Sequence, residues 1–129
     1  MSFKIGDVVW IYTERSHDPK YKMCAIIAKG ITEDTWLVSF ICSEAPKPPK
    51  MNKYYIPLQK NESTPFLEYD SFLNCWDPVE FPTKEIEDSL KKDKGNHCGP
   101  LAEGYLGKMI EAVNACPQIE MRKLLRYFE

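Results

Sequence analysis

The chain has 129 residues, of which 43% are hydrophobic and 28% are charged, and this size and composition fit one folded domain and exclude a disordered or fibrous chain. The longest apolar runs, Met23 to Ala28 and Val8 to Tyr12, are far shorter than the ~18 residues that a transmembrane helix requires, and the opening residues contain no signal-peptide core. We therefore expect a cytoplasmic protein that does not enter a membrane.

The net charge of −2 conceals an uneven distribution along the chain. Residues 1–60 carry nine Lys or Arg against six Asp or Glu, whereas residues 61–129 carry eight against thirteen. An anionic partner is therefore expected to bind the first half. The five cysteines are scattered singly without a C-x-x-C pair, a pattern that indicates neither a disulfide framework nor a zinc site, and we expect no metal or cofactor.

Three β-branched and aromatic runs predict strands over residues 5–12, 22–29 and 35–43. Residues 30–34 are short enough to join the second and third strands as a hairpin. The third strand is apolar on both faces: Trp36, Val38, Phe40 and Cys42 alternate with Leu37, Ser39 and Ile41. This pattern is typical of a strand at the centre of a closed or strongly curled sheet.

The second half of the chain is predicted to change from strands to helices. Residues 43–53 hold three prolines and three lysines and predict a loop, after which residues 54–58 and 71–76 predict two short strands. Acidic residues after Pro82 predict a helix over about 84–92, Pro100 is predicted to open the next helix, and residues 118–129 predict a terminal one. We therefore expect one domain over 1–129 of the α+β class, mainly β, with a small SH3-like barrel over about 4–82 and helices over about 83–129.

Cationic side chains flank the first three strands. They are Arg15, Lys20 and Lys22 in the loop after the first strand, and Lys47, Lys50 and Lys53 in the Pro-rich loop after the third. If the sheet curls, the two loops rise at one end and form a basic groove suited to a single-stranded phosphate backbone, on which nearby aromatic residues such as Tyr54 can stack bases.

The order of these segments resembles the MazF/PemK family of toxins from bacterial toxin–antitoxin modules. The resemblance covers roughly residues 4–115 and is carried by GDVVWIY (6–12), KMCAIIAKG (22–30), TWLVSFICSE (35–44) and FLEYDSFLNCWDPVEFPTKEI (66–86). It implies an SH3-like barrel with appended helices that forms a homodimer, cleaves single-stranded RNA without a metal, and is neutralised by an antitoxin protein.

The resemblance also implies where the chemistry lies. The ribose 2′-hydroxyl attacks the adjacent phosphorus and leaves a 2′,3′-cyclic phosphate, with an Arg at the start of the second strand and a Thr or Ser at the end of the third as the main carriers. Here Lys22 stands at the Arg position, followed by Met23 rather than Pro, and Cys42 and Ser43 stand at the hydroxyl pair. Lys lacks the planar fork of Arg, and a thiol is a poor donor to phosphate. Arg15 is a candidate to supply the guanidinium.

These departures leave several readings of the sequence open. The chain is either an endoribonuclease, a catalytically weakened relative of one, or a non-catalytic SH3-like barrel that binds nucleic acid or a peptide. An aromatic-cage reader is a third alternative, which requires two or three exposed aromatic residues converging near an acidic one. Trp10 and Trp36 are predicted as core anchors, and Asp70 as the cap of a turn before a strand.

Overall fold

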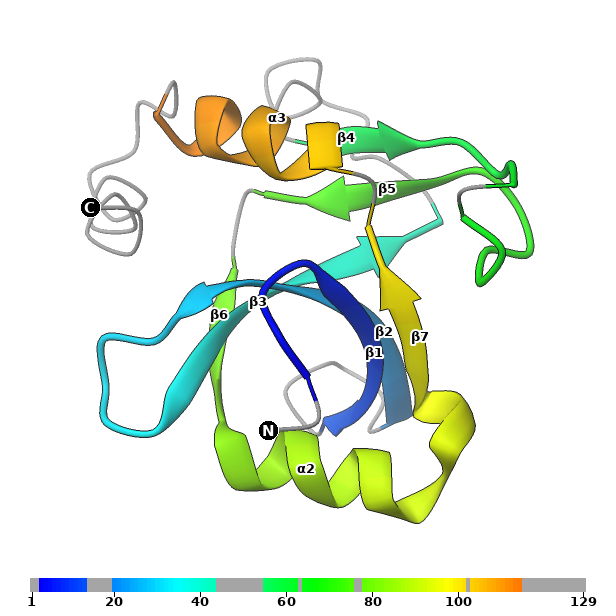
Figure 1. Cartoon of the computed structure of the whole chain (residues 1–129). Coiled ribbons are helices and arrows are strands. Elements are labelled where there is room, and N and C mark those ends of the chain that lie inside the picture. Colours follow the sequence, from blue (N-terminus) through cyan, green and yellow to red (C-terminus); the bar gives the residue numbers. More distant parts are fainter. Residues whose placement is uncertain are drawn as a thin grey trace.

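A computed structural model describes residues 3–13, 20–43, 55–62, 64–75, 78–101 and 103–114. These residues form a curled antiparallel sheet with helices at its ends (Figure 1). The strands are β1 (Asp7–Thr13), β2 (Lys20–Lys29), β3 (Thr35–Cys42), β4 (Tyr55–Leu58), β5 (Ser71–Asn74), β6 (Val79–Pro82) and β7 (His97–Pro100). The helices are α2 (Thr83–Lys92), the short 3-10 helix η1 (Lys94–Asn96) and α3 (Glu103–Asn114).

The sheet is centred on β3, as its apolar pattern predicts. The strand order is β4-β5-β3-β2-β1-β7, and β6 also pairs with β3. Because β5 pairs with Ile41 and Cys42 and β6 pairs with residues 35–38, the two strands follow one another antiparallel to β3. Between Leu73 and Val79 there are five residues, against two in β3 between Val38 and Ile41, so the pairings of β5 and β6 with β3 do not form one continuous ladder.

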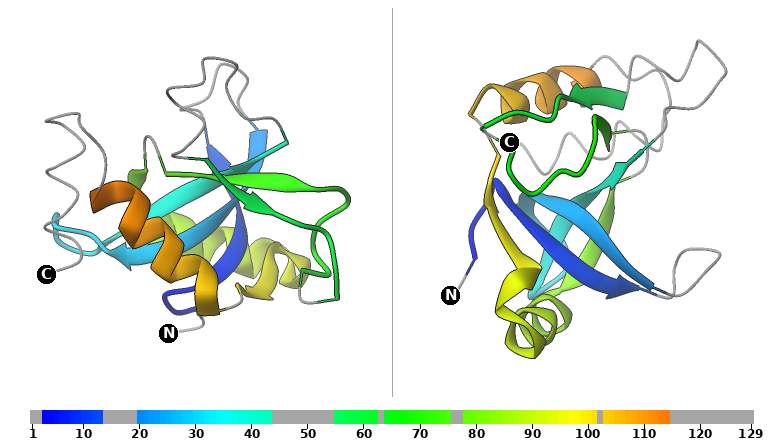
Figure 2. Two further views of the ribbon diagram at one scale, coloured as in Figure 1. Left: turned by 90° about the horizontal axis from the view of Figure 1, so that it is seen from above. Right: turned by 90° about the vertical axis from the view of Figure 1, so that its right-hand side faces the viewer.

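Two hydrophobic cores lie on the two faces of β1, β2 and β3. On one face, Val8, Ala25 and Leu37 belong to a buried cluster that also contains Leu101 and residues of β4 and β5. Tyr105 and Leu106 of α3 are partly buried and pack against this cluster. On the other face, buried residues of the three strands pack with Phe81 and with Ile86 of α2. The two helices lie at opposite ends of the molecule (Figure 2, right), and each covers one core. The alternating faces predicted for the third strand are therefore confirmed.

The turn between β2 and β3 is tied closely to the start of α2. Gly30 N–H donates to Thr35 O at 2.8 Å and closes the predicted hairpin. Trp36 Nε1 donates to Thr83 Oγ1 at 2.9 Å, and Thr83 Oγ1 in turn donates to Asp34 O at 3.0 Å. Trp36 is 8% exposed, which confirms it as a core anchor. These bonds fix the hairpin register, and with it the residues that β2 and β3 present at their other ends.

The structure corrects the predicted end of the barrel. β6 and β7 are strands that the sequence analysis did not predict, and Pro100, predicted to open a helix, lies in β7. β7 returns after α2 to pair with β1 at the sheet edge, where Leu101 N–H donates to Gly6 O at 2.8 Å. Pro is tolerated on such an edge because it need not donate. The helix at 84–92 is confirmed, and residues 118–129 lie outside the described residues.

None of the helices in the described ranges is both long enough and apolar enough to span a membrane.

Candidate functional site

A fork between β2 and β3 lies outside the two cores. Their pairing runs from Lys29 opposite Trp36 to Cys24 opposite Phe40. Beyond that point β2 stays with β1, whereas the end of β3 pairs with β5, so the two strands part. A cavity of about 510 Å³ opens between them, within the ~300–1,000 Å³ typical of ligand sites.

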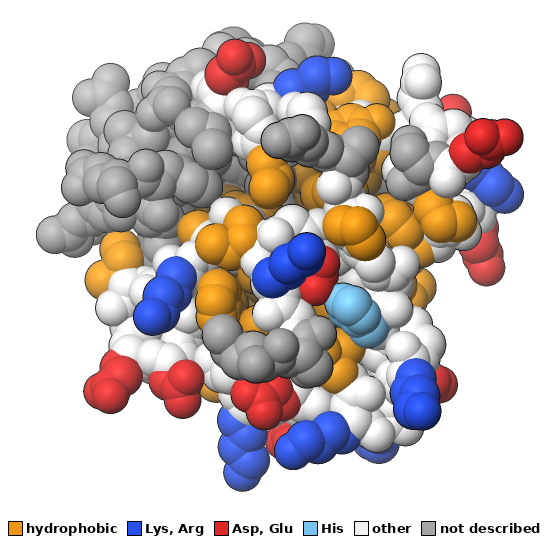
Figure 3. All heavy atoms as spheres, in the orientation of Figure 1, with side chains coloured by type: hydrophobic (Ala, Val, Ile, Leu, Met, Phe, Trp, Pro, Cys, Tyr) orange, Lys and Arg blue, Asp and Glu red, His pale blue; other side chains and the backbone are white. Residues whose placement is uncertain are grey.

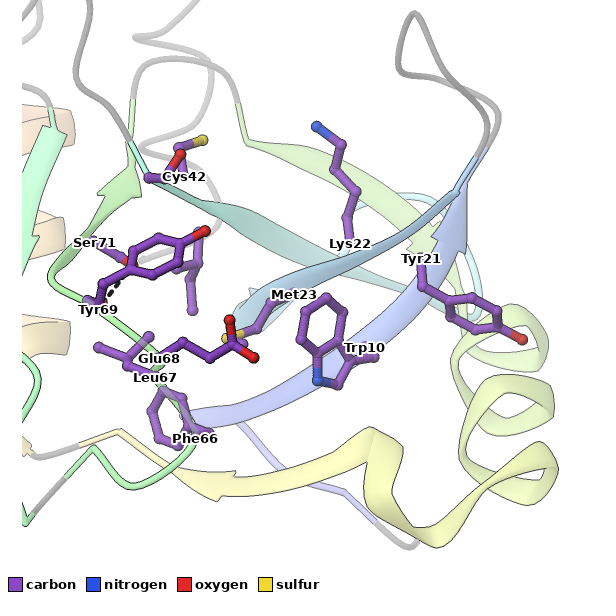
Figure 4. A pocket seen from close by; sticks show the side chains of 12 residues that line it. Trp10, Tyr21, Lys22, Met23, Cys42, Phe66, Leu67, Glu68, Tyr69 and Ser71 are labelled. Carbon is purple, nitrogen blue, oxygen red and sulfur yellow. Dashed lines mark hydrogen bonds between the residues drawn. The ribbon is translucent and has the colours of Figure 1, made fainter.

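We call this cavity the fork pocket (Figure 4). It is lined from β1 and β2 by Trp10, Tyr21, Lys22 and Met23, from the end of β3 by Ile41, Cys42 and Ser43, and from the segment before β5 by Phe66, Leu67, Glu68, Tyr69 and Ser71.

Two predicted site residues, Lys22 and Cys42, lie on one side of the fork. They share the strand faces of Cys24 and Phe40, which pack in the core under α2, and in Figure 4 both side chains rise in the same direction. Lys22 Nζ lies 5.8 Å from the centre of the Phe40 ring, a cation–π contact that holds the ammonium at the pocket. Cys42 is half-buried and Ser43 is exposed. Lys22, Cys42 and Ser43 therefore all belong to the lining of the fork pocket.

Aromatic and acidic side chains lie on the opposite side. Trp10 and Met23 are cross-strand neighbours on β1 and β2, and Figure 4 shows both pointing away from Lys22, toward Glu68 and Phe66. One pair further along the ribbon, the Tyr12 and Tyr21 rings meet edge to face, with centroids 5.5 Å apart. The prediction of Trp10 as a core anchor is thus wrong: it is half-buried at the pocket, because the ribbon extends beyond the core there.

Hydrogen bonds position the segment that carries Glu68. Lys60 N–H donates to Asp70 Oδ1 at 2.7 Å, and Lys60 Nζ donates to Glu68 O at 3.0 Å. Thr64 Oγ1 donates to Gln59 O at 2.7 Å. Leu67 is 4% exposed and anchors the segment in the core under α3. The predicted structural role of Asp70 in a turn before a strand is confirmed.

The structure brings together only part of the predicted site. Lys22, Cys42 and Ser43 meet at the fork pocket, and Lys20 is the first residue of β2, beside it in the chain. Arg15, Lys47, Lys50, Lys53 and Tyr54 lie outside the described residues.

Phe66, Glu68 and Tyr69 also line the fork pocket and were not predicted as site residues. Their signal was the aromatic and acidic run FLEY before the Asp70–Ser71 pair.

A second, more open cavity of about 580 Å³ lies beside the first, and we call it the η1 pocket. It shares Trp10 and Tyr21 with the fork pocket and is completed by Lys92, Asp93, Gly95 and Asn96. The charge around it is mixed: Figure 3 shows lysines interspersed with Asp and Glu along the edge of the molecule formed by α2. This edge is therefore not a single cationic patch.

The buried thiols take no part in this site. Burial raises the pKa of Cys75 to about 12 and raises the pKa of Cys24 further still, so both remain protonated near neutral pH. Burial also raises the pKa of Cys98. Within the described ranges, no three His, Cys, Asp or Glu side chains are grouped so as to hold a metal ion.

Comparison of the chain with models of protein families gave no match, and comparison with curated proteins gave none either.

Proposed function

We propose that the protein is a metal-independent endoribonuclease, or a catalytically weakened relative of one, that acts on single-stranded RNA in the fork pocket. The observation that carries this proposal is that Lys22, Cys42 and Ser43 line one cavity. These are the positions at which the resemblance to MazF/PemK toxins expects the chemistry. The curled antiparallel sheet supports an SH3-like barrel as the fold of this site. A homodimer and an antitoxin protein are further parts of the proposal that rest on the resemblance alone.

In this proposal Lys22 binds the phosphate that is attacked. The 2′-oxygen forms a bond to phosphorus, the bond from phosphorus to the 5′-oxygen breaks, and the products are a 2′,3′-cyclic phosphate and a 5′-hydroxyl. The ammonium of Lys22 offsets the negative charge that grows on the phosphorane. Its contact with the Phe40 ring lets it act without first being ordered by the substrate.

Glu68 is the proposed acceptor of the 2′-proton. It is a carboxylate in the same pocket as Lys22, carried on a segment held by the Lys60–Asp70 bond. General-base catalysis requires such a group within hydrogen-bond reach of the substrate. The Cys42 thiol and the Ser43 hydroxyl are the proposed donors to the departing 5′-oxygen. Cys42 is half-buried and is therefore less hydrated, whereas Ser43 is exposed and is more accessible to substrate.

Non-catalytic binding of single-stranded RNA is the second candidate, and the lining of the pocket favours it in one respect. No arginine lies within the described ranges, so the bidentate grip that a guanidinium gives a phosphorane is missing from the described part of the site. Trp10, Phe66 and Tyr69 line the same pocket as Glu68, but of the three only Tyr69 is exposed, so the two or three exposed rings that an aromatic cage requires are not present among them. Lys22 at the same cavity also opposes a cationic ligand, because like charges repel.

One experiment separates the candidates. Purified protein is incubated with a mixed single-stranded RNA in EDTA, and the 3′-ends of any fragments are identified. We expect fragments with 2′,3′-cyclic phosphate that are lost in Lys22→Ala and Glu68→Gln and kept in Lys29→Ala, an exposed lysine at the far end of β2. Salt-sensitive binding that weakens in Lys22→Ala, without cleavage, would establish the binding module instead. Neither binding nor cleavage would refute both.

A further inference from the structure

The η1 pocket is continuous with the proposed site of RNA binding. Trp10 and Tyr21 line both cavities, and in Figure 4 the two rings lie between the fork pocket and α2, with Tyr21 extending toward the helix. Tyr21 is 36% exposed, and the Tyr12 ring beside it is 47% exposed. Exposed aromatic rings beside a phosphate-binding group are the platform on which single-stranded bases stack.

The far wall of the η1 pocket is tied to Trp10. Asn96 Nδ2 donates to Ser89 O at 2.8 Å, and Ser89 Oγ donates to Trp10 O at 2.5 Å. Ser89, which joins the two bonds, is 5% exposed, and Trp10 and Asn96 at either end are half-buried. Asn96 on the polar wall is therefore linked through Ser89 to the backbone of Trp10, and such links favour a preformed site.

The polar wall presents hydrogen-bond acceptors. The Asn96 amide uses Nδ2 within the protein, which leaves its carbonyl oxygen as an acceptor. The backbone N–H of Gly95 is already occupied, because it donates to Asp93 Oδ1 at 2.8 Å, and a carboxylate retains further lone pairs after one such bond. Among the four RNA bases only guanine carries two adjacent donors, N1–H and the N2 amino group, on its Watson–Crick edge.

We propose that the η1 pocket binds a guanine of the RNA strand whose backbone lies in the fork pocket. The base stacks on Trp10 and Tyr21 and donates through N1 and N2 to Asp93 and Asn96, while Lys92 at the end of α2 binds an adjoining phosphate. This inference rests on the proposed RNA binding and adds to it a base preference and the residues that carry the preference.

The test measures affinity for RNA that cannot be cleaved. Fully 2′-O-methylated oligouridylate of about ten nucleotides, within the ~4–16 nucleotides that small single-strand-binding domains cover, is compared with strands carrying one guanine, and with strands carrying inosine at the same position. We expect one guanine placement to bind about tenfold tighter, the factor that a bidentate base contact gives. Inosine, which lacks the N2 amino group, should lose most of this gain.

The protein variant Asp93→Asn should abolish the guanine preference, measured as the ratio of the affinities for the guanine strand and for oligouridylate. Asn at this position still accepts from Gly95 N–H, so η1 is kept. Asp88→Asn, the same change at an exposed position of α2 outside the pocket, is the matched control and should keep the preference. Equal binding of the uridine and guanine strands, with affinity still dependent on Lys22, would overturn this inference and leave the proposed function standing. No binding of any strand would overturn both.

Discussion

Gly30→Ala tests how the hairpin register positions the fork. A Cβ at Gly30 would overlap the Thr35 hydroxyl and come within 2.9 Å of the Thr35 carbonyl carbon. The hydroxyl lies 2.6 Å from Glu80 Oε1 and 2.7 Å from Thr32 O, so moving it breaks a charge-assisted bond worth about 1.5–3 kcal/mol. Displacing the backbone adds about 1–3 kcal/mol, and the stiffer unfolded chain returns about 0.4–1 kcal/mol.

The free energy of unfolding in urea should therefore fall by about 2–5 kcal/mol in Gly30→Ala. In a Thr35→Ala background the hydroxyl is already gone, and the same substitution should cost about 1–3 kcal/mol less. Gly104→Ala, an exposed position of α3 with open space around it, is the control and should stabilise by about 0.5–1 kcal/mol. A Gly30→Ala loss below about 0.5 kcal/mol, or an equal loss in both backgrounds, would refute the close packing of Gly30 on Thr35.

Three other predictions concern single groups. Asp70→Ala should lower the free energy of unfolding by about 1 kcal/mol because Lys60 N–H loses its acceptor, with Asp70→Asn keeping most of the stability in thermal denaturation. His97→Ala should cost about 1–3 kcal/mol in urea, since the Asp7 carboxylate, 3% exposed, loses a partner at 2.9 Å; an unchanged midpoint would contradict this. Because burial raises the pKa of Cys75 from 9.0 to about 12, the unfolded chain releases this proton first, and stability should fall as pH rises from about 9 toward 12, less steeply in Cys75→Ala.

The sequence was most informative where local pattern and tertiary environment agree. The strands at 5–12, 22–29 and 35–43 are rich in β-branched and aromatic residues, and β1, β2 and β3 occupy nearly these ranges. The double apolar face of β3 required burial on both sides, and the structure supplies two cores. Long, strongly patterned elements are predictable because propensity and burial favour the same conformation.

The short strands were not predictable from local pattern. The four residues of β7, His97 to Pro100, include glycine and proline, which disfavour strands, and Gly99 has a φ of 110°. Pairing with β1 makes this segment a strand, and that partner lies about ninety residues earlier in the chain. β6 likewise depends on Thr35 to Val38 of β3. In both segments tertiary pairing overrides propensity.

The residues of the candidate site divide in the same way, into those that local pattern predicts and those that tertiary contacts place. Lys22 and Cys42 meet because the hairpin register places the start of β2 beside the end of β3, and alternation puts both side chains on one face. Glu68 reaches the same cavity only because the path of its segment is set by the Lys60–Asp70 bond and by burial of Leu67. Such contacts depend on a folded loop, and no periodicity in the sequence encodes them.

The central claim, that an RNA backbone lies in the fork pocket, is tested most directly by amide chemical shifts. Titration of the isotope-labelled protein with fully 2′-O-methylated oligouridylate should shift the amides of residues 21–23, 41–43 and 66–69, which line the pocket, and these shifts should be lost in Lys22→Ala. Shifts confined to the hairpin turn at 31–34 or to the exposed face of α2, with residues 21–23 unmoved, would contradict the account.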